Sequence, residues 1–233
     1  MPLAVRSALF GLLRRSLLSF LLSVRAREVQ SAHRPESFRG SPIIELESLV
    51  ERLDLEKLFG LNAPLHVDLG CGAGSFLCAL AQRMPEKNFL GIERLLGRIR
   101  SAAQKTAKLD NVRLLRMESS YAVRYLLPAG ATETFYLLFP DPWPKRRHWR
   151  RRIVTGDFLR AASRVLAENG TLRIATDHLD YFGRIKEAAR TTRDLIVSER
   201  TDVDLPLTKF QEKFRAQGVP IHWLELRKGS PVR

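Results

Sequence analysis

Short apolar runs alternate with helical stretches along most of this chain, and this alternation constrains the fold more than any other feature. The apolar runs occupy residues 65–69, 89–92, 112–115, 134–138 and 172–175. The stretches with helical periodicity occupy residues 76–84, 97–108, 122–127, 157–167 and 179–189. Five successive strand and helix pairs predict an α/β fold, with a mostly parallel sheet covered by helices on both faces. Ligands of such sheets bind beyond the carboxyl ends of the strands, so candidate functional residues should follow each strand.

The residues before the first strand form two different regions. Between Ile43 and Phe59, apolar residues recur near helical spacing, which predicts an amphipathic helix on the main body. Residues 1–34 are rich in arginine and lack the run of about 20 apolar residues that a membrane span needs. They fit an organellar transit peptide, a basic helix on RNA or on a membrane surface, or an over-long start. We therefore divide the chain into a basic extension, residues 1–42, and a single domain, residues 43–233.

The net charge of +14 is concentrated in two places. Residues 1–34 carry six Arg and one Glu, which gives +5, and residues 145–152 carry six cations and no acid. Because such a run repels itself, it favours a polyanionic partner over a merely solvated surface. Two cysteines, Cys71 and Cys78, are too few for a disulfide framework or a zinc finger. We expect them to pack in the core of a metal-free protein in a reducing, cytoplasmic compartment.

The first strand ends in a glycine-rich turn with the sequence DLGCGAGS at positions 68–75. Glycines at positions 70, 72 and 74 let the backbone approach a ligand closely, as a nucleotide-like cofactor requires. Ser75 stands where a dinucleotide-binding turn has its third glycine, which favours another adenosine cofactor over NAD. The alternative for the glycines alone is that they only end the strand and begin the helix.

Acidic side chains close the next two strands. Glu93 follows the second strand, 19 residues after the last glycine of the turn, near the spacing at which an acid binds ribose hydroxyls in this fold. Arg94 beside it supports the alternative of a neutralised structural carboxylate. Glu118 and Ser119 follow the third strand, where a polar group can bond to an adenine amino group. A helix cap by Ser119 or Ser120 would explain the same residues.

The fourth strand leads into FPDPWPKRRHWRRR, at positions 139–152. Prolines on both sides of Asp141 fix the backbone and remove two donors, which suits a carboxylate that accepts hydrogen bonds from a guanine edge. Trp143 offers a stacking surface for an extruded base, and the cations that follow can clamp phosphates. A core position for Trp143 and a turn role for Asp141 are the alternatives, but they do not account for the combination.

This block resembles the signature of the bacterial tRNA (guanine-N7-)-methyltransferases. The resemblance extends from about Pro64 to the end of the chain and includes VDLGCGAGSFL, LGIE, ATDHLDYF, TKFQEKF and IHWLEL. It implies a Rossmann-like methyltransferase fold, S-adenosylmethionine as the cofactor and tRNA as the partner. The expectation of a monomer or a homodimer does not come from the resemblance. The implied reaction is transfer of a methyl group to N7 of a guanosine in the variable loop.

The strand ends and the resemblance together assign roles to individual residues. Asp141 is the expected catalytic residue. The expected cofactor-binding residues are Asp68, Gly70, Gly72, Gly74, Glu93, Glu118, Ser119 and Asp141. The expected substrate-binding residues are Lys145, Arg147, Arg150 and Arg151, and by resemblance alone Asp177, Thr208 and Gln211. For Asp177, a helix N-cap is the alternative. The family has a Thr-x-x-Glu motif where this chain has Thr208 and Gln211, which leaves a carbonyl acceptor without a charge.

Other functions fit part of the sequence. A non-enzymatic RNA-binding relative is motivated by Gln211, and a methyltransferase that acts on a different RNA base is the alternative that is harder to exclude. An NAD-dependent oxidoreductase is disfavoured by Ser75 and by the basic block.

Overall fold

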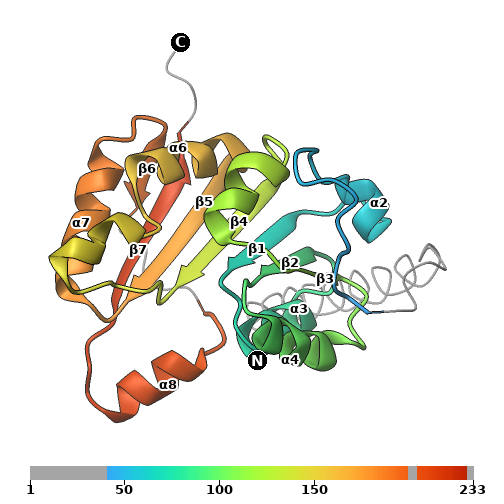
Figure 1. The fold of residues 1–233 in the computed structure, drawn as a ribbon, viewed down its shortest axis with the longest axis horizontal. Helices are drawn as coiled ribbons and strands as arrows, with labels where there is room; N and C mark the ends of the chain where they lie inside the picture. The colour runs from blue at the N-terminus through green and yellow to red at the C-terminus, as the bar shows by residue number, and fades with distance from the viewer. Residues whose placement is uncertain (1–40, 199–203, 230–233) are drawn as a thin grey trace, which may run out of the picture.

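The computed structural model describes residues 41–198 and 204–229. The expected extension, residues 1–42, lies almost entirely outside the described residues, and so do the three interpretations of residues 1–34. The described part of the chain forms a seven-stranded sheet with the strand order β3-β2-β1-β4-β5-β7-β6 (Figure 1). No helix in it is long and apolar enough to cross a membrane.

The sheet confirms the predicted α/β class. Its strands are β1 (Leu65–Leu69), β2 (Asn88–Ile92), β3 (Val112–Leu115), β4 (Thr132–Leu138), β5 (Leu166–Thr176), β6 (Leu195–Ser198) and β7 (His222–Lys228). Strands β1 to β5 pair in parallel, whereas β7 is antiparallel to both β5 and β6. The order of the strands reverses between β1 and β4, and such a switch point opens a crevice at the carboxyl ends of the strands.

Helices cover both faces of the sheet. They are α2 (Leu55–Phe59), α3 (Ser75–Arg83), α4 (Leu96–Thr106), α5 (Ser119–Tyr121), the π-helix η2 (Ala122–Leu126), the 3-10 helix η3 (Arg146–Arg151), α6 (Gly156–Val165), α7 (Leu179–Arg190) and α8 (Lys209–Ala216). Helices α3 and α4 share one apolar cluster with β2 and β3. Helices α6, α7 and η2 share the larger cluster with β1, β4 and β5.

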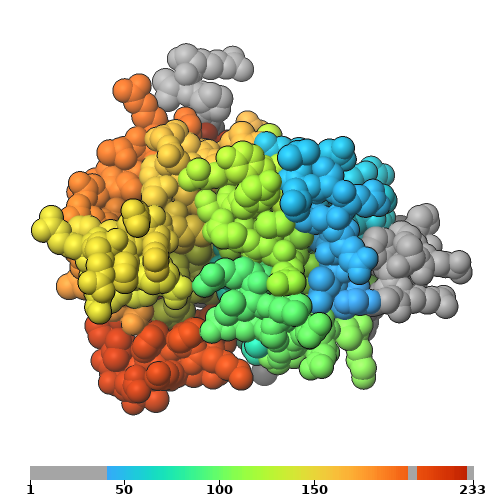
Figure 2. All heavy atoms as spheres, viewed as in Figure 1, coloured from blue at the N-terminus to red at the C-terminus, as the bar shows by residue number. Residues whose placement is uncertain are grey.

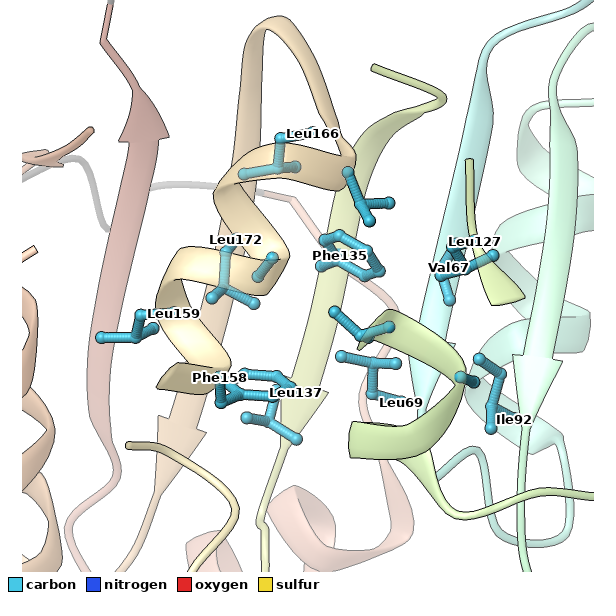
Figure 3. Close-up of a cluster of buried hydrophobic side chains, with 14 of the residues drawn as sticks. Val67, Leu69, Ile92, Leu127, Phe135, Leu137, Phe158, Leu159, Leu166 and Leu172 are labelled. Atoms are coloured by element: carbon cyan, nitrogen blue, oxygen red, sulfur yellow. The ribbon is translucent and has the colours of Figure 1, made fainter. Parts of the chain in front are cut away.

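The larger cluster holds the strands that carry the candidate site. Phe135 and Leu137 of β4 lie beside Phe158 of α6, and Val67 and Leu69 of β1 lie beside them (Figure 3). All five side chains are at most 3% exposed. Each buried side chain of this size contributes roughly 1.5 to 3 kcal/mol, so the carboxyl ends of β1 and β4 are firmly fixed.

The predicted helix from Ile43 to Phe59 is wrong over most of its length. Only residues 55–59 are helical, after the Asp54 carboxylate caps α2 by accepting from the Lys57 amide at 2.9 Å. Ile43 instead forms a bridge to Leu114, and the Ile44 amide donates to the Leu114 carbonyl at 2.7 Å. These residues use their backbone groups to extend the edge of the sheet at β3, a pairing that local periodicity does not reveal.

Candidate active site

The glycine turn after β1 leaves open space for a ligand at two of its three glycines. Gly70, Gly72 and Gly74 all have positive φ angles, of 82°, 55° and 74°. A Cβ atom at Gly70 or Gly72 would meet no atom within 4 Å, but at Gly74 it would lie 2.7 Å from the Cβ of Ala102. Gly74 therefore allows α3 to begin against α4, which a larger side chain at this position would prevent.

Two buried carboxyl groups lie beneath this turn. Glu93, which is 5% exposed, accepts the Gly72 amide at 3.1 Å with Oε2 and the Leu95 amide at 2.8 Å with Oε1. It is therefore fixed by backbone amides, and it makes no ion pair with Arg94 in the described part of the chain. Burial, and then the charge of Glu93, raise the pKa of Asp68 to about 7. A site that forces two carboxyl groups together in a low-dielectric environment favours a cationic ligand.

Glu118 has a structural role as well as a position in the site. Its carboxylate caps α5 by accepting the amides of Ser120 at 2.9 Å and Tyr121 at 2.7 Å. The predicted alternative, a cap by Ser119 or Ser120, is therefore wrong, because Ser119 is already the first helical residue. Glu118 still lines the cavity described below, as does Ser119.

The turn from Phe139 to Pro144 holds an unusual backbone. Phe139 and Trp143 both have positive φ angles, of 55° and 42°. Residues other than glycine rarely adopt this backbone conformation, and such backbone strain is typical of functional sites. The Phe139 amide donates to the Ala175 carbonyl of β5 at 2.8 Å, and its ring contacts the rings of Phe210 and Phe214 in α8. Asp141, between the two strained residues, is exposed and lines the cavity.

The basic run that follows contains one buried arginine. Arg152 is 6% exposed and donates from Nε to the Pro142 carbonyl at 2.7 Å and from Nη2 to Asp180 at 3.0 Å. Its guanidinium also lies over the rings of Trp149 and Tyr181, 4.9 and 4.7 Å from the ring centroids. Arg152 therefore ties the strained turn to α7 and is not available to a phosphate.

The remaining cations of the run are accessible. Lys145, Arg147, Arg150 and Arg151, the four predicted substrate-binding cations, are all exposed. Arg151 lines the cavity, and its guanidinium lies over the Trp143 ring at 4.9 Å from the centroid. The structure thus brings Arg151 together with the cofactor-site residues, whereas the other three lie outside the lining of the cavity.

These elements enclose a cavity of about 710 Å³ at the carboxyl ends of β1 to β4. Figure 2 shows it as a hollow between the green surface at the start of α4 and the yellow surface of the basic run. The predicted site residues that line it are Gly70, Glu93, Glu118, Ser119, Asp141 and Arg151. Asp68, Gly72 and Gly74 are not part of its lining. Sites for small molecules commonly have volumes of roughly 300 to 1,000 Å³, so the cavity is large enough for a nucleoside cofactor and part of a base.

Sequence reasoning missed further lining residues, among them Arg94, Leu95, Arg98, Met117 and Ile153. Leu95 and Met117 each lie within two residues of an acid at a strand end, so the strand-end rule could have found them. Arg98 had no such signal, because it lies inside the predicted helix from residue 97 to residue 108. Among the described residues, no group of three His, Cys, Asp or Glu side chains could hold a metal ion.

The three residues assigned by resemblance alone also lie outside the lining of the cavity. Asp177 follows β5 and is half-buried, but His178 is the N-cap of α7, with Nδ1 accepting the Tyr181 amide at 3.3 Å. The predicted alternative of an Asp177 cap is therefore wrong. Thr208 and Gln211 form a capping box at the start of α8, with Thr208 Oγ1 accepting the Gln211 amide and Gln211 Oε1 accepting the Thr208 amide. A glutamate makes the same pair of contacts, so the glutamine preserves the geometry.

Comparisons with known proteins agree with this architecture. A family model described as "Putative methyltransferase" matches residues 62–224. The tRNA (guanine-N(7)-)-methyltransferase of Leifsonia xyli subsp. xyli is 38% identical over 184 residues, which cover 75% of this chain and 81% of the relative. The protein of the same name from Thermotoga maritima is 35% identical over 183 residues, 76% of this chain. The match spans 58% of the length of that relative.

Solved structures show the same fold at low sequence identity. The antibiotic-resistance methyltransferase Kmr aligns with a TM-score of 0.55 and 15% identity, over 77% of this chain and 93% of its own. The 16S rRNA methyltransferase KamB aligns with a TM-score of 0.52 and 17% identity, over 76% of this chain and 93% of its own. The fold is therefore that of the Rossmann-like methyltransferases, and the sequence relatives show that the chain belongs to the tRNA (guanine-N(7)-)-methyltransferase family.

Proposed function

We propose that the protein transfers the methyl group of S-adenosylmethionine to N7 of a guanosine in the variable loop of tRNA. The observation that carries the proposal is the cavity at the switch point of the sheet. Acids of the cofactor site line it, the strained turn brings Asp141 and Trp143 to its wall, and Arg151 of η3 lies on the same wall. The proposal places the protein in the cytoplasm, as a monomer or a homodimer.

The residues around the glycine turn fit the charge of the cofactor. S-adenosylmethionine carries a sulfonium and an ammonium group against one carboxylate, so it has a net positive charge. Asp68 and Glu93 lie buried beneath the turn, and Glu118 lies on the wall of the cavity. Open space at Gly70 and Gly72 allows a ligand to approach the backbone there. We assign these residues to cofactor binding on that basis.

This reaction requires the protein to position the reactants, and it requires no proton transfer. Guanine N7 has a free lone pair in the plane of the ring, and the bound cofactor supplies an electrophilic methyl group on sulfur. The protein must therefore hold the base in line with that methyl group and exclude water. For well-oriented reactants this effect reaches roughly 7 to 11 kcal/mol.

The turn at residues 139–144 supplies the groups for this task. The base acquires a positive charge as the methyl group arrives, and a carboxylate fixed between prolines at Asp141 can balance it. The Trp143 ring offers a face for stacking on the extruded base, once the Arg151 guanidinium that covers it is displaced toward a phosphate.

The experiment that tests the proposal follows labelled methyl groups from S-adenosylmethionine into an unmodified tRNA transcript, with identification of the product nucleoside by mass spectrometry. We expect 7-methylguanosine as the labelled product. The Asp141→Asn variant is the matched test of the site, since it keeps the shape of the side chain and removes the charge. Label in a different nucleoside, or no transfer by a protein that binds the cofactor normally, would contradict the proposal.

A further inference from the structure

Two arginines line the cavity on the side away from the basic run. Arg94 follows β2 and Arg98 lies in the first turn of α4, and both are exposed. Within the described part of the chain, neither guanidinium pairs with a carboxylate. Both guanidinium groups are therefore free to meet an anionic ligand that enters the cavity from solvent.

The local structure gives these cations no stabilisation of its own. The first turn of α4 contains no acid, and Arg98 lies near the amino end of the helix, where the helix dipole disfavours positive charge. Arg100 adds a further exposed cation on the next turn. A helix that begins with unpaired arginines favours an anion from outside.

The cofactor does not explain them. S-adenosylmethionine has a net positive charge, and its cationic groups suit the acids at positions 68, 93 and 118 rather than two arginines. The RNA of the proposed function is the polyanion, with one negative charge on every nucleotide. Its phosphates match unpaired guanidinium groups in both charge and geometry.

The positions of the arginines relative to the cavity define the path that the RNA strand would take. Arg94 and Arg98 form one rim, and Arg151 with Trp143 forms the other. Figure 2 shows a hollow between the green surface at the start of α4 and the yellow surface of the basic run, with α8 below it in this view. An RNA strand whose phosphates are held on both rims would cross the mouth of the cavity. A base between the two rims would then face the cavity that Asp141 lines.

We propose that Arg94 and Arg98 bind backbone phosphates of the RNA on the rim opposite Arg151 and Trp143, so that the RNA strand spans the cavity and its target base is directed inward. This inference rests on the proposed function, and it names a second phosphate-binding surface for the same substrate. The other ligand that could meet these arginines is the carboxylate of the cofactor, and the test separates the two.

The test compares Arg94→Ala/Arg98→Ala with the charge-matched control Arg190→Ala/Arg193→Ala in the full-length protein. Arg190 and Arg193 are also exposed, but Arg190 ends α7 and Arg193 follows it, and neither lines the cavity. Affinity for a tRNA transcript is measured from about 50 to about 200 mM salt, the cofactor Kd is measured by calorimetry, and methyl transfer is measured in parallel. Loss of two phosphate contacts should reduce the slope of log affinity against log salt by about 1.4 to 1.8 units, relative to the control.

Each outcome decides between specific alternatives. A reduced slope with a cofactor Kd within about twofold of wild type supports the inference, since two phosphate contacts alter only the salt-dependent affinity. A slope equal to that of the control, with or without a weaker cofactor Kd, overturns it while the proposed function stands. If the wild-type protein binds tRNA but forms no 7-methylguanosine, the proposed function fails. The salt slopes of the two double variants then still test whether Arg94 and Arg98 contact phosphates. If the wild type does not bind tRNA, both fail.

Discussion

Replacing Arg152 by alanine should separate the structural part of the basic run from the part that contacts RNA. Arg152 is 6% exposed and makes four contacts, to the Pro142 carbonyl, to Asp180, and to the rings of Trp149 and Tyr181. From the sequence alone, all six cations of residues 145–152 would be expected to bind phosphates. The structure instead predicts that this one member stabilises the turn that carries Asp141.

The size of the effect follows from the contacts. A hydrogen bond from a charged donor to the half-buried Pro142 carbonyl contributes roughly 1.5 to 3 kcal/mol, and each cation–π contact roughly 0.5 to 1 kcal/mol. The Asp180 side chain is 51% exposed, so that ion pair adds only about 0 to 1 kcal/mol. We therefore expect Arg152→Ala to lower the free energy of unfolding by roughly 2.5 to 6 kcal/mol, which is a large fraction of the stability of a typical domain.

The assay pairs urea unfolding with the salt dependence of tRNA binding, well below the melting temperature of each variant. Arg150→Ala is the matched control, because Arg150 is exposed in the same 3-10 helix. The control should lose less than about 0.5 kcal/mol of stability and reduce the salt slope by roughly 0.7 to 0.9 units. Arg152→Lys keeps the charge and remains testable if the alanine variant does not fold. Equal stability of the Arg152 and Arg150 variants, with an equally reduced slope, would refute the reasoning.

Three further predictions concern the cavity and α8. Asp141→Ala should lose most of its single-turnover methyl transfer while its cofactor Kd, measured by calorimetry, changes little, and near-normal turnover would exclude Asp141 from the mechanism. Burial raises the pKa of Asp68 from 3.8 to about 7, so the folded state binds this proton more tightly and stability falls as pH rises from about 4 to about 7. Asp68→Asn removes this penalty. Compared with wild type, its free energy of unfolding, measured with urea in the absence of cofactor, should increase by an amount that grows from pH about 5 to about 8, up to on the order of 4 kcal/mol. An increase independent of pH would contradict the assignment. Gln211→Ala should destabilise by about 0.5 to 2 kcal/mol and lower the rate of methyl transfer, because α8 packs on Phe139, whereas Gln211→Glu should match wild type in both assays; an alanine variant indistinguishable from wild type would show that the capping box is dispensable.

The strand and helix pairs could be predicted because each depends on short-range periodicity. The predicted strands at 65–69 and 112–115 coincide with β1 and β3, and the predicted helices shifted by only one or two residues at most ends. The segment from residue 43 to residue 54 could not be predicted in the same way. Its apolar spacing resembles a helix, but its partner is Leu114, about 70 residues away, and no local pattern records that pairing.

The candidate site could be predicted as a set of strand ends but not as a set of contacts. The strand-end rule found Glu93, Glu118 and Asp141, all of which line the cavity. Burial of Arg152 depends on α7 and on Trp149, so a run of cations in the sequence cannot distinguish it from Arg151. The use of Gly74 for helix packing likewise depends on Ala102 of α4, which is distant in sequence.

The central claim is that this cavity directs a methyl group to N7 of a guanine, and one comparison tests it most directly. The wild-type protein is given labelled S-adenosylmethionine with two tRNA transcripts of the same sequence, one of them made with 7-deazaguanosine, which has carbon in place of N7. The account predicts methyl transfer to the ordinary transcript and none to the 7-deaza transcript, with similar affinity for both. Equal transfer to the two transcripts would contradict the claim.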